Sequence, residues 1–137
     1  MEIRIFTSAD ADQVIALWRE CGLTRPWNDP RADIDRLVGF QPGLFFVGED
    51  GGAIVAAVLA GYDGHRGSIN YLAVSPARRC EGLGAAMLAH AEAALRGLGC
   101  PKINLQVRAD NRDVVGFYER QGYEIFEVVD LGKRFSA

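Results

Sequence analysis

The residues whose types and spacing best suit chemistry form one short turn, Arg79 to Gly84, with the sequence Arg-Cys-Glu-Gly-Leu-Gly. An apolar run from Ile69 to Val74 precedes the turn, and good helix formers from Ala85 to Leu98 follow it. A strand that leads through glycines into a helix aims unpaired backbone N–H groups into one concavity at the positive end of the helix. Such a concavity suits a phosphate or pyrophosphate, because glycine lets an anion approach the backbone closely.

Two other kinds of phosphate-binding loop fit this turn poorly. No Gly-Lys-Ser/Thr follows it, which excludes a Walker loop. A dinucleotide fingerprint needs a third glycine in register and an acidic residue after the next strand, and the run from Lys102 to Val107 supplies no acidic end. The alternative without a ligand is an ordinary strand-to-helix loop.

Hydrophobic patterns on either side predict the elements that must position this turn. Apolar residues three and four apart, such as Val14, Leu17 and Trp18, predict a helix after residues 7–9 that ends at Gly22. Pro30 after Asp29 predicts a capped helix start, and Asp-Gly-Gly at 50–52 predicts a hairpin. We expect strands at 2–6, 44–49, 53–61, 68–74, 102–107 and 123–129, with a short last one at 131–135, and further helices at 30–38, 84–97 and 112–121.

The resulting order is β-α-α-β-β-β-α-β-α-β, followed by the short last strand. A hairpin meander combined with crossover helices predicts an α/β (α+β) fold, with a mixed central sheet flanked by helices. The chain has no repeat, low-complexity tract or linker, so residues 1–137 are predicted to form one domain.

Length and composition exclude several classes of protein. Of the 137 residues, 49% are hydrophobic and 24% are charged, which is typical of a globular protein. No apolar run approaches the roughly 18 residues of a membrane span, and the N-terminus lacks the long apolar region of a signal peptide. We therefore expect a cytoplasmic protein without a membrane partner. The net charge of −3 argues against nucleic acid as a partner.

The three cysteines, Cys21, Cys80 and Cys100, are odd in number and widely spaced. No C-x-x-C or Cys/His cluster accompanies them, so neither a disulfide framework nor a metal site is predicted. Cys80 lies beside two arginines near a helix start, where thiols tend to be reactive, but the sequence links no histidine to it. Its reactivity is left open.

Three motifs, in this order around these elements, resemble those of the GNAT family, the Gcn5-related N-acetyltransferases. They are Leu-Ala-Val-Ser-Pro at 72–76, Arg-x-x-Gly-x-Gly at 79–84, and Asn111 with Phe-Tyr at 117–118 and Gly-Tyr at 122–123. The segment from Leu17 to Pro30 also resembles a bacterial subgroup, the YpeA-like proteins. The chain departs from the family at Cys80, where glycine is frequent, and at Glu81, where a basic residue is common.

The resemblance implies transfer of an acetyl group from acetyl-CoA, as co-substrate, to a primary amine. Backbone N–H groups of the turn would hold the pyrophosphate, and an exposed strand edge would pair with the pantetheine arm. A backbone N–H of that edge would also stabilise the thioester oxygen. The residues implied in cofactor binding are Leu72, Ala73, Val74, Arg79, Cys80, Glu81, Gly82, Leu83, Gly84, Ala85, Asn111 and Tyr118.

Two of these residues belong to the predicted last helix. Asn111 is placed either to cap that helix or to contact the cofactor, and one side chain can do both. Tyr118, seven residues later, is either a half-buried core aromatic or a general acid that protonates the departing CoA thiolate. We favour the general acid, because the family resemblance puts a tyrosine at this position.

The acceptor site is less sharply marked. Trp27, Asn28 and Asp29, in the loop between the first two helices, and Tyr71 are our candidates, with Trp27 either a lid on the core or a binding surface. The acceptor is a small-molecule or protein amine, and the ten acidic and six basic residues among the first 70 favour a cationic one. Candidates for the base that deprotonates it are Tyr71, Asp63, His65, Glu20 and Asp29.

Other functions remain open on the sequence alone. A non-catalytic acyl-CoA-binding or regulatory module of the same fold would also bind coenzyme A. A generic nucleotide-phosphate binder would bind ATP or NADH at least as tightly as acetyl-CoA. The edges of a mixed sheet are compatible with a monomer or a homodimer.

Overall fold

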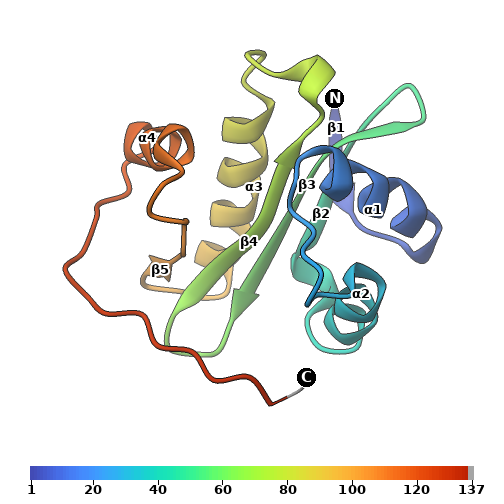
Figure 1. Cartoon of the computed structure of the whole chain (residues 1–137). Coiled ribbons are helices and arrows are strands. Elements are labelled where there is room, and N and C mark those ends of the chain that lie inside the picture. The colour runs from blue at the N-terminus through green and yellow to red at the C-terminus, as the bar shows by residue number, and fades with distance from the viewer. Residues whose placement is uncertain (136–137) are drawn as a thin grey trace. The chain divides into compact units, whose positions relative to one another are not determined.

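A computed structural model describes residues 1–135, and its contacts divide the chain into two compact units, Met1–Leu105 and the segment from Gln106 onward (Figure 1). The strands of the first unit are β1 (Glu2–Ile5), β2 (Phe45–Asp50), β3 (Ala53–Tyr62), β4 (Gly67–Val74) and β5 (Ile103–Asn104). Its α-helices are α1 (Ala11–Glu20), α2 (Pro30–Val38) and α3 (Leu83–Gly97), with 3-10 turns at Ser8–Asp10, Pro42–Leu44 and Pro76–Arg78.

The five strands form one mixed sheet in the order β1-β2-β3-β4-β5. The pairs from β1 to β4 are antiparallel, whereas β4 and β5 are parallel and are joined through α3. Helices α1 and α2 cover one face of the sheet and α3 covers the other (Figure 1). This mixed sheet flanked by helices confirms the predicted fold class.

Local signals in the sequence account for most element boundaries. Asp29 caps α2, because its carboxylate accepts hydrogen bonds from the backbone N–H groups of Arg31 and Ala32, and Pro30 occupies the first helical position. The β2–β3 hairpin turns through Gly51 and Gly52, which adopt φ of 57° and 85°. The predicted hairpin and capped helix are both confirmed.

A stack of aromatic rings forms the centre of the core on the α1 face. The rings of Phe6 and Phe45 lie 4.4 Å apart, and that of Trp18 lies 6.1 Å from Phe45 and 4.0 Å from Tyr71. The planes of each pair are nearly parallel, at 4° to 15°. Because Trp18 is fully buried at the middle of the stack, α1 is fixed against both β2 and β4.

Strand β4 changes its pairing along its length. On one edge it follows β3, with a register shift between Ala57 and Leu59 that leaves an extra residue in β4. On the other edge it pairs with β5 only at Gly67 and Ser68. Within the described residues of the first unit, the later part of that edge has no strand partner.

The second unit contains α4 (Arg112–Arg120), and its remaining described residues form neither helix nor strand. Three sequence predictions are therefore wrong: β5 is shorter than 102–107, and no strand forms at 123–129 or at 131–135. A strand needs a neighbour for its N–H and C=O groups, and the described residues of this unit offer none. The apolar pattern stays exposed instead, with Val128 and Leu131 77% and 87% accessible.

No α-helix among the described residues is long and apolar enough to span a lipid bilayer.

An ion pair between the buried carboxylate of Asp10 and the partly exposed Arg4 ties β1 to the start of α1. Two guanidinium nitrogens of Arg4 donate to Asp10 at 2.7 and 2.9 Å, and Arg4 also donates to Glu49 on β2. The backbone N–H of Thr7 adds a bond of 2.8 Å to Asp10. The hydrogen bonds from Arg4 above all hold the pKa of Asp10 at about 2, below its ordinary value of 3.8.

We expect Asp10→Asn to lower the free energy of unfolding at pH 7 by about 2 kcal/mol. Because the pKa of Asp10 is lowered in the folded protein, its contribution is present above about pH 4 and is lost as the pH falls towards 2. Urea unfolding at pH 7 and at pH 2 measures this loss. Asp12→Asn is the control and should cost little, since the Asp12 carboxylate pairs with Arg31 but is 90% exposed. Equal losses at pH 7 and pH 2 would contradict the assignment.

Candidate functional site

The glycine turn lies where the sequence placed it, between the end of β4 and the start of α3. Its backbone is left-handed at Cys80 and Gly82, with φ of 66° and 79°. Gly82 occupies the N-cap of α3, and no side chain caps this helix. The first helical hydrogen bond runs from the N–H of Ala86 to the carbonyl of Gly82, at 3.1 Å. The N–H groups of the preceding residues, 83–85, therefore have no acceptor in the helix and suit an anion.

The charged side chains in and beside the turn differ in whether they are paired. Both carboxylate oxygens of Glu81 accept hydrogen bonds from Nε of Arg78 at 3.1 Å, and Arg78 also pairs with Asp50 at 2.9 Å. Arg79 is exposed and makes no ion pair with any described residue. The acidic departure at Glu81 is thus engaged by a neighbouring cation, and the free positive charge of the turn belongs to Arg79.

Leu72, Ala73 and Val74 form the end of β4 that leads into this turn, on the edge without a strand partner in the first unit. The N–H of Ser75 donates to Val55 on β3 at 2.8 Å. Since the N–H groups of successive strand residues point to opposite edges, the N–H of Val74 points away from β3. This edge can accept a further extended chain by strand-like pairing.

Tyr71 precedes this edge and has an unusual backbone for an aromatic residue, with φ of 52°. Its hydroxyl donates to Asp33 on α2 at 2.7 Å, and its ring stacks on Trp18. Burial first, and the bond to Asp33 second, raise the pKa of Tyr71. The phenol is therefore held neutral as a donor. Sequence reasoning missed Asp33, because no local pattern links residues that lie 38 positions apart.

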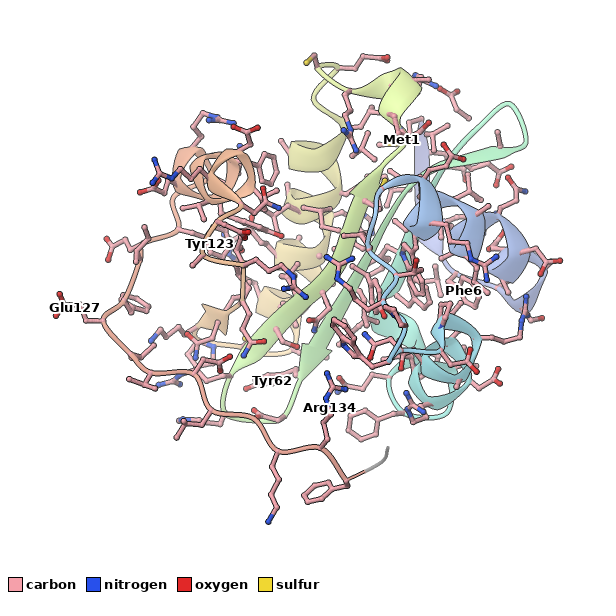
Figure 2. The ribbon with its side chains drawn as sticks, viewed as in Figure 1. Met1, Phe6, Tyr62, Tyr123, Glu127 and Arg134 are labelled. Carbon is pink, nitrogen blue, oxygen red and sulfur yellow. The ribbon has the colours of Figure 1, made fainter. Side chains whose placement is uncertain are left out.

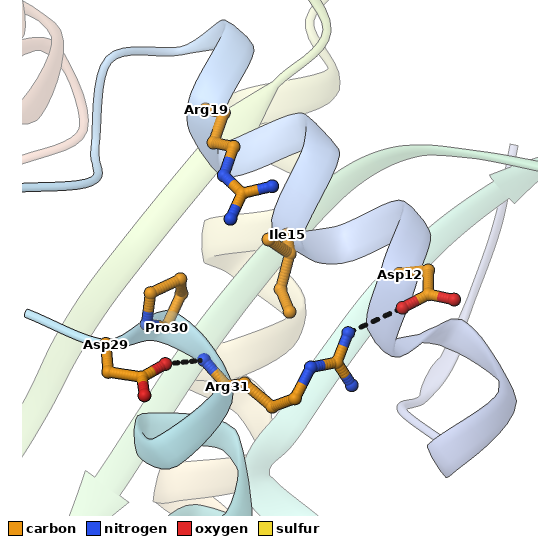
Figure 3. A pocket seen from close by; sticks show the side chains of 6 residues that line it. All are labelled: Asp12, Ile15, Arg19, Asp29, Pro30 and Arg31. Carbon is orange, nitrogen blue, oxygen red and sulfur yellow. Dashed lines mark hydrogen bonds and ion pairs between the residues drawn. The ribbon is translucent and has the colours of Figure 1, made fainter.

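The side chains of the predicted acceptor loop, Trp27, Asn28 and Asp29, do not converge on a common point. Trp27 is 49% exposed and Asn28 is exposed, while the Asp29 carboxylate is occupied in capping α2. Figure 3 shows Asp29 on a pocket between α1 and α2, where Arg31 reaches across to Asp12 at 2.5 Å. At this pocket, Arg31 and Asp12 therefore pair with each other, and the Asp29 carboxylate is hydrogen-bonded to the backbone of α2.

A second, more apolar groove lies between the end of α2 and the strands β3 and β4. Leu37, Phe40 and Leu59 form its apolar part, and Asn70 and Asn104 contribute amide groups. Tyr62, at the end of β3, also borders it (Figure 2). The groove opens on the sheet face that carries Tyr71, because Asn70 pairs with Leu59 and both side chains point to that face. No local pattern in the sequence indicates this groove, because its walls come from separate elements.

The second unit holds the remaining two candidates. Asn111 caps α4, with its side-chain oxygen accepting from the N–H of Val114 at 3.4 Å. Tyr118 is 8% exposed and its ring contacts those of Phe117 and Tyr123 edge-on, at 5.2 and 5.4 Å. Burial raises the pKa of Tyr118 to about 12. The phenol thus keeps its proton at neutral pH.

Among the described residues, no group of three or more His, Cys, Asp and Glu side chains is arranged to hold a metal ion.

Comparison with known proteins identifies relatives over almost the whole chain. Residues 7–123 match the acetyltransferase (GNAT) family. An acetyltransferase of Yersinia enterocolitica is 50% identical over 134 residues, which are 98% of this chain and 95% of that protein. Ard1 from Thermoplasma volcanium has a similar fold, with a TM-score of 0.78 at 24% identity over 91% of this chain and 83% of that one.

One similar structure contains a cofactor derivative. AAC(6')-Iy, in complex with the bisubstrate analog CoA-S-monomethyl-acetylneamine, has a TM-score of 0.80 at 15% identity, over 98% of each chain. Identities this low establish the shared fold, while the family match and the Yersinia relative establish the kinship of the sequences.

The left-handed residues of the turn generate a prediction about its stability. Gly82→Ala forces a Cβ into a conformation that costs an L-residue about 1 kcal/mol, so we expect a loss of that size in the free energy of unfolding. Cys80→Gly removes the same strain, and we expect a gain of about 0.5 kcal/mol after the added chain entropy. Urea unfolding of both variants tests this. Changes of the same sign would show that the turn does not need these conformations.

Proposed function

Because the chain belongs to the acetyltransferase (GNAT) family, we propose that it transfers the acetyl group of acetyl-CoA to a primary amine of a small molecule or a protein. The observation that carries this proposal is the continuity of two binding features. The unpaired edge of β4 ends directly in the turn that opens the uncapped α3. A ligand with an amide-bearing arm and a pyrophosphate matches this pair of features.

In this proposal the backbone of 79–85 binds the pyrophosphate of acetyl-CoA, and Arg79 adds a positive charge. Leu72 to Val74 pair with the amides of the pantetheine arm as an added strand would. The outward N–H of Val74 suits the thioester oxygen, on which negative charge develops as the amine attacks. Asn111 keeps its capping role and contacts the cofactor as well.

Tyr118 is the proposed general acid. Attack by the amine nitrogen forms the C–N bond, and breaking the C–S bond releases a thiolate that needs a proton. With a pKa of about 12, the Tyr118 phenol carries that proton throughout the neutral range. Trp27, Asn28 and Asp29 form the proposed border of the acceptor site, with Tyr71 on its inner side.

We expect calorimetric titration to show roughly micromolar binding of acetyl-CoA and much weaker binding of ATP and NADH. We expect this difference because ATP and NADH offer phosphates to the turn but no pantetheine amides to the edge of β4. A folded sample that binds none of the three would overturn the proposal. Equal binding of all three would show that the turn binds phosphate groups in general and does not select acetyl-CoA.

We expect Tyr118→Phe to leave the affinity for acetyl-CoA unchanged and to lower kcat about 100-fold, as loss of a general acid does. Release of free thiol during turnover with a panel of primary amines measures kcat. Tyr123→Phe is the matched control, since that ring contacts Tyr118 and loses the same hydroxyl. Unchanged turnover in Tyr118→Phe would remove the general-acid role and leave the acetyl transfer itself standing.

A further inference from the structure

The hydroxyl of Tyr71 and the carboxylate of Asp33 form a hydrogen-bonded pair between β4 and α2. The hydroxyl donates to Oδ2 of Asp33 at 2.7 Å, while Oδ1 of the same carboxylate pairs with Arg36. The Asp33 side chain is 22% exposed, so water reaches it only in part. Each carboxylate oxygen therefore has one partner, and the Tyr71 oxygen keeps its lone pairs available to accept a hydrogen bond.

The backbone places this pair beside the proposed thioester site. Tyr71 lies within the register shift of β4 and immediately precedes Leu72, the first residue of the unpaired edge. Its left-handed conformation is unfavourable for an L-residue. The stack on Trp18, with ring centroids 4.0 Å apart and planes 15° apart, holds the side chain there. The hydroxyl is thus fixed on the α1–α2 face next to the edge.

The groups packed around Tyr71 leave Asp33 as its proton acceptor. Asp33 and Arg36, both on α2, are the charged groups that act on the Tyr71 hydroxyl. From α1 the ring of Trp18 covers it, and the thiol of Cys21 donates to the Val74 carbonyl at 3.3 Å. Burial keeps the phenol neutral. It can therefore take up a proton only by passing its own to Asp33.

We propose that Tyr71 and Asp33 form a proton relay that deprotonates an ammonium acceptor before it attacks the thioester. This inference rests on the proposed acetyl transfer and names the class of its acceptor, an amine that arrives protonated. The ammonium gives one proton to the Tyr71 oxygen as the hydroxyl proton moves to Asp33, which later releases it to water. The free amine forms the C–N bond and the C–S bond breaks. The second nitrogen proton passes to water, Tyr118 donates its proton to the sulfur, and the Tyr118 phenolate regains a proton from water, so that one proton is released overall.

In this relay Tyr71 is a catalytic residue, because it touches the acceptor, and Asp33 is a positioning residue that acts through it. Arg36 pairs with the other oxygen of that carboxylate and holds it in place beside the Tyr71 hydroxyl. The competing explanation is structural, in which the same hydrogen bond only fastens α2 to the sheet. The two explanations differ in one respect: a proton relay matters for a protonated acceptor and is irrelevant to an acceptor that is already neutral.

The test compares two kinds of acceptor with the wild-type chain, Tyr71→Phe and Asp33→Asn. Benzylamine is an ammonium at pH 7, whereas hydroxylamine is largely neutral. We expect both variants to lose about 100-fold or more in kcat with benzylamine and to stay within a few-fold of wild type with hydroxylamine. Turnover of the variants with benzylamine should also rise with pH towards the pKa of the ammonium, where the wild type has levelled off.

Asp35→Asn is the matched control, since Asp35 is an exposed carboxylate on the same helix. Equal losses with both acceptors would show a structural role and overturn the relay, and so would unchanged turnover with benzylamine. Retained hydroxylamine turnover, counted above the enzyme-free reaction of hydroxylamine with acetyl-CoA, shows in the same assay that each variant is folded. A wild-type chain that binds acetyl-CoA but acetylates neither amine would instead count against the proposed acetyl transfer, and the relay would fall with it.

Discussion

The unequal pairing of β4 is the constraint on which the rest of the first unit depends. Backbone N–H and C=O groups need partners, and β3 pairs with one edge of β4 on both sides of the register shift. On the other edge β5 satisfies only Gly67 and Ser68. Among the described residues of the first unit, the rest of that edge therefore has no strand partner up to the turn before α3. A sheet that was fully paired here would leave no room for an extended ligand.

The register shift in β4 is held by the aromatic core. One extra residue gives Tyr71 a left-handed backbone, which is unfavourable by itself. The stack of Phe6, Phe45, Trp18 and Tyr71 offsets this, since each aromatic pair contributes about 0.5–1.5 kcal/mol beyond its buried area. Nε1 of Trp18 is buried without a hydrogen-bond partner among the described residues. That loss shows how strongly ring packing, rather than hydrogen bonding, determines this part of the core.

Features set by adjacent residues could be predicted from the sequence. The cap at Asp29, the glycine hairpin at 50–52 and the glycine turn before α3 follow from the conformations that these residue types favour. Features that depend on distant partners could not. The apolar-rich segment 123–129 does not form a strand without a neighbour, and the contact between Tyr71 and Asp33 joins residues 38 positions apart.

The order of the strands in the sheet is also their order along the chain. During synthesis, each of β2, β3 and β4 therefore finds its earlier partner already made when it leaves the ribosome, and no strand has to be inserted between two others. Two connections are long, because α1 and α2 lie between β1 and β2, and α3 lies between β4 and β5. Such a chain can assemble vectorially from its N-terminal end, with few loops to close and little opportunity for a wrong strand to compete for an edge.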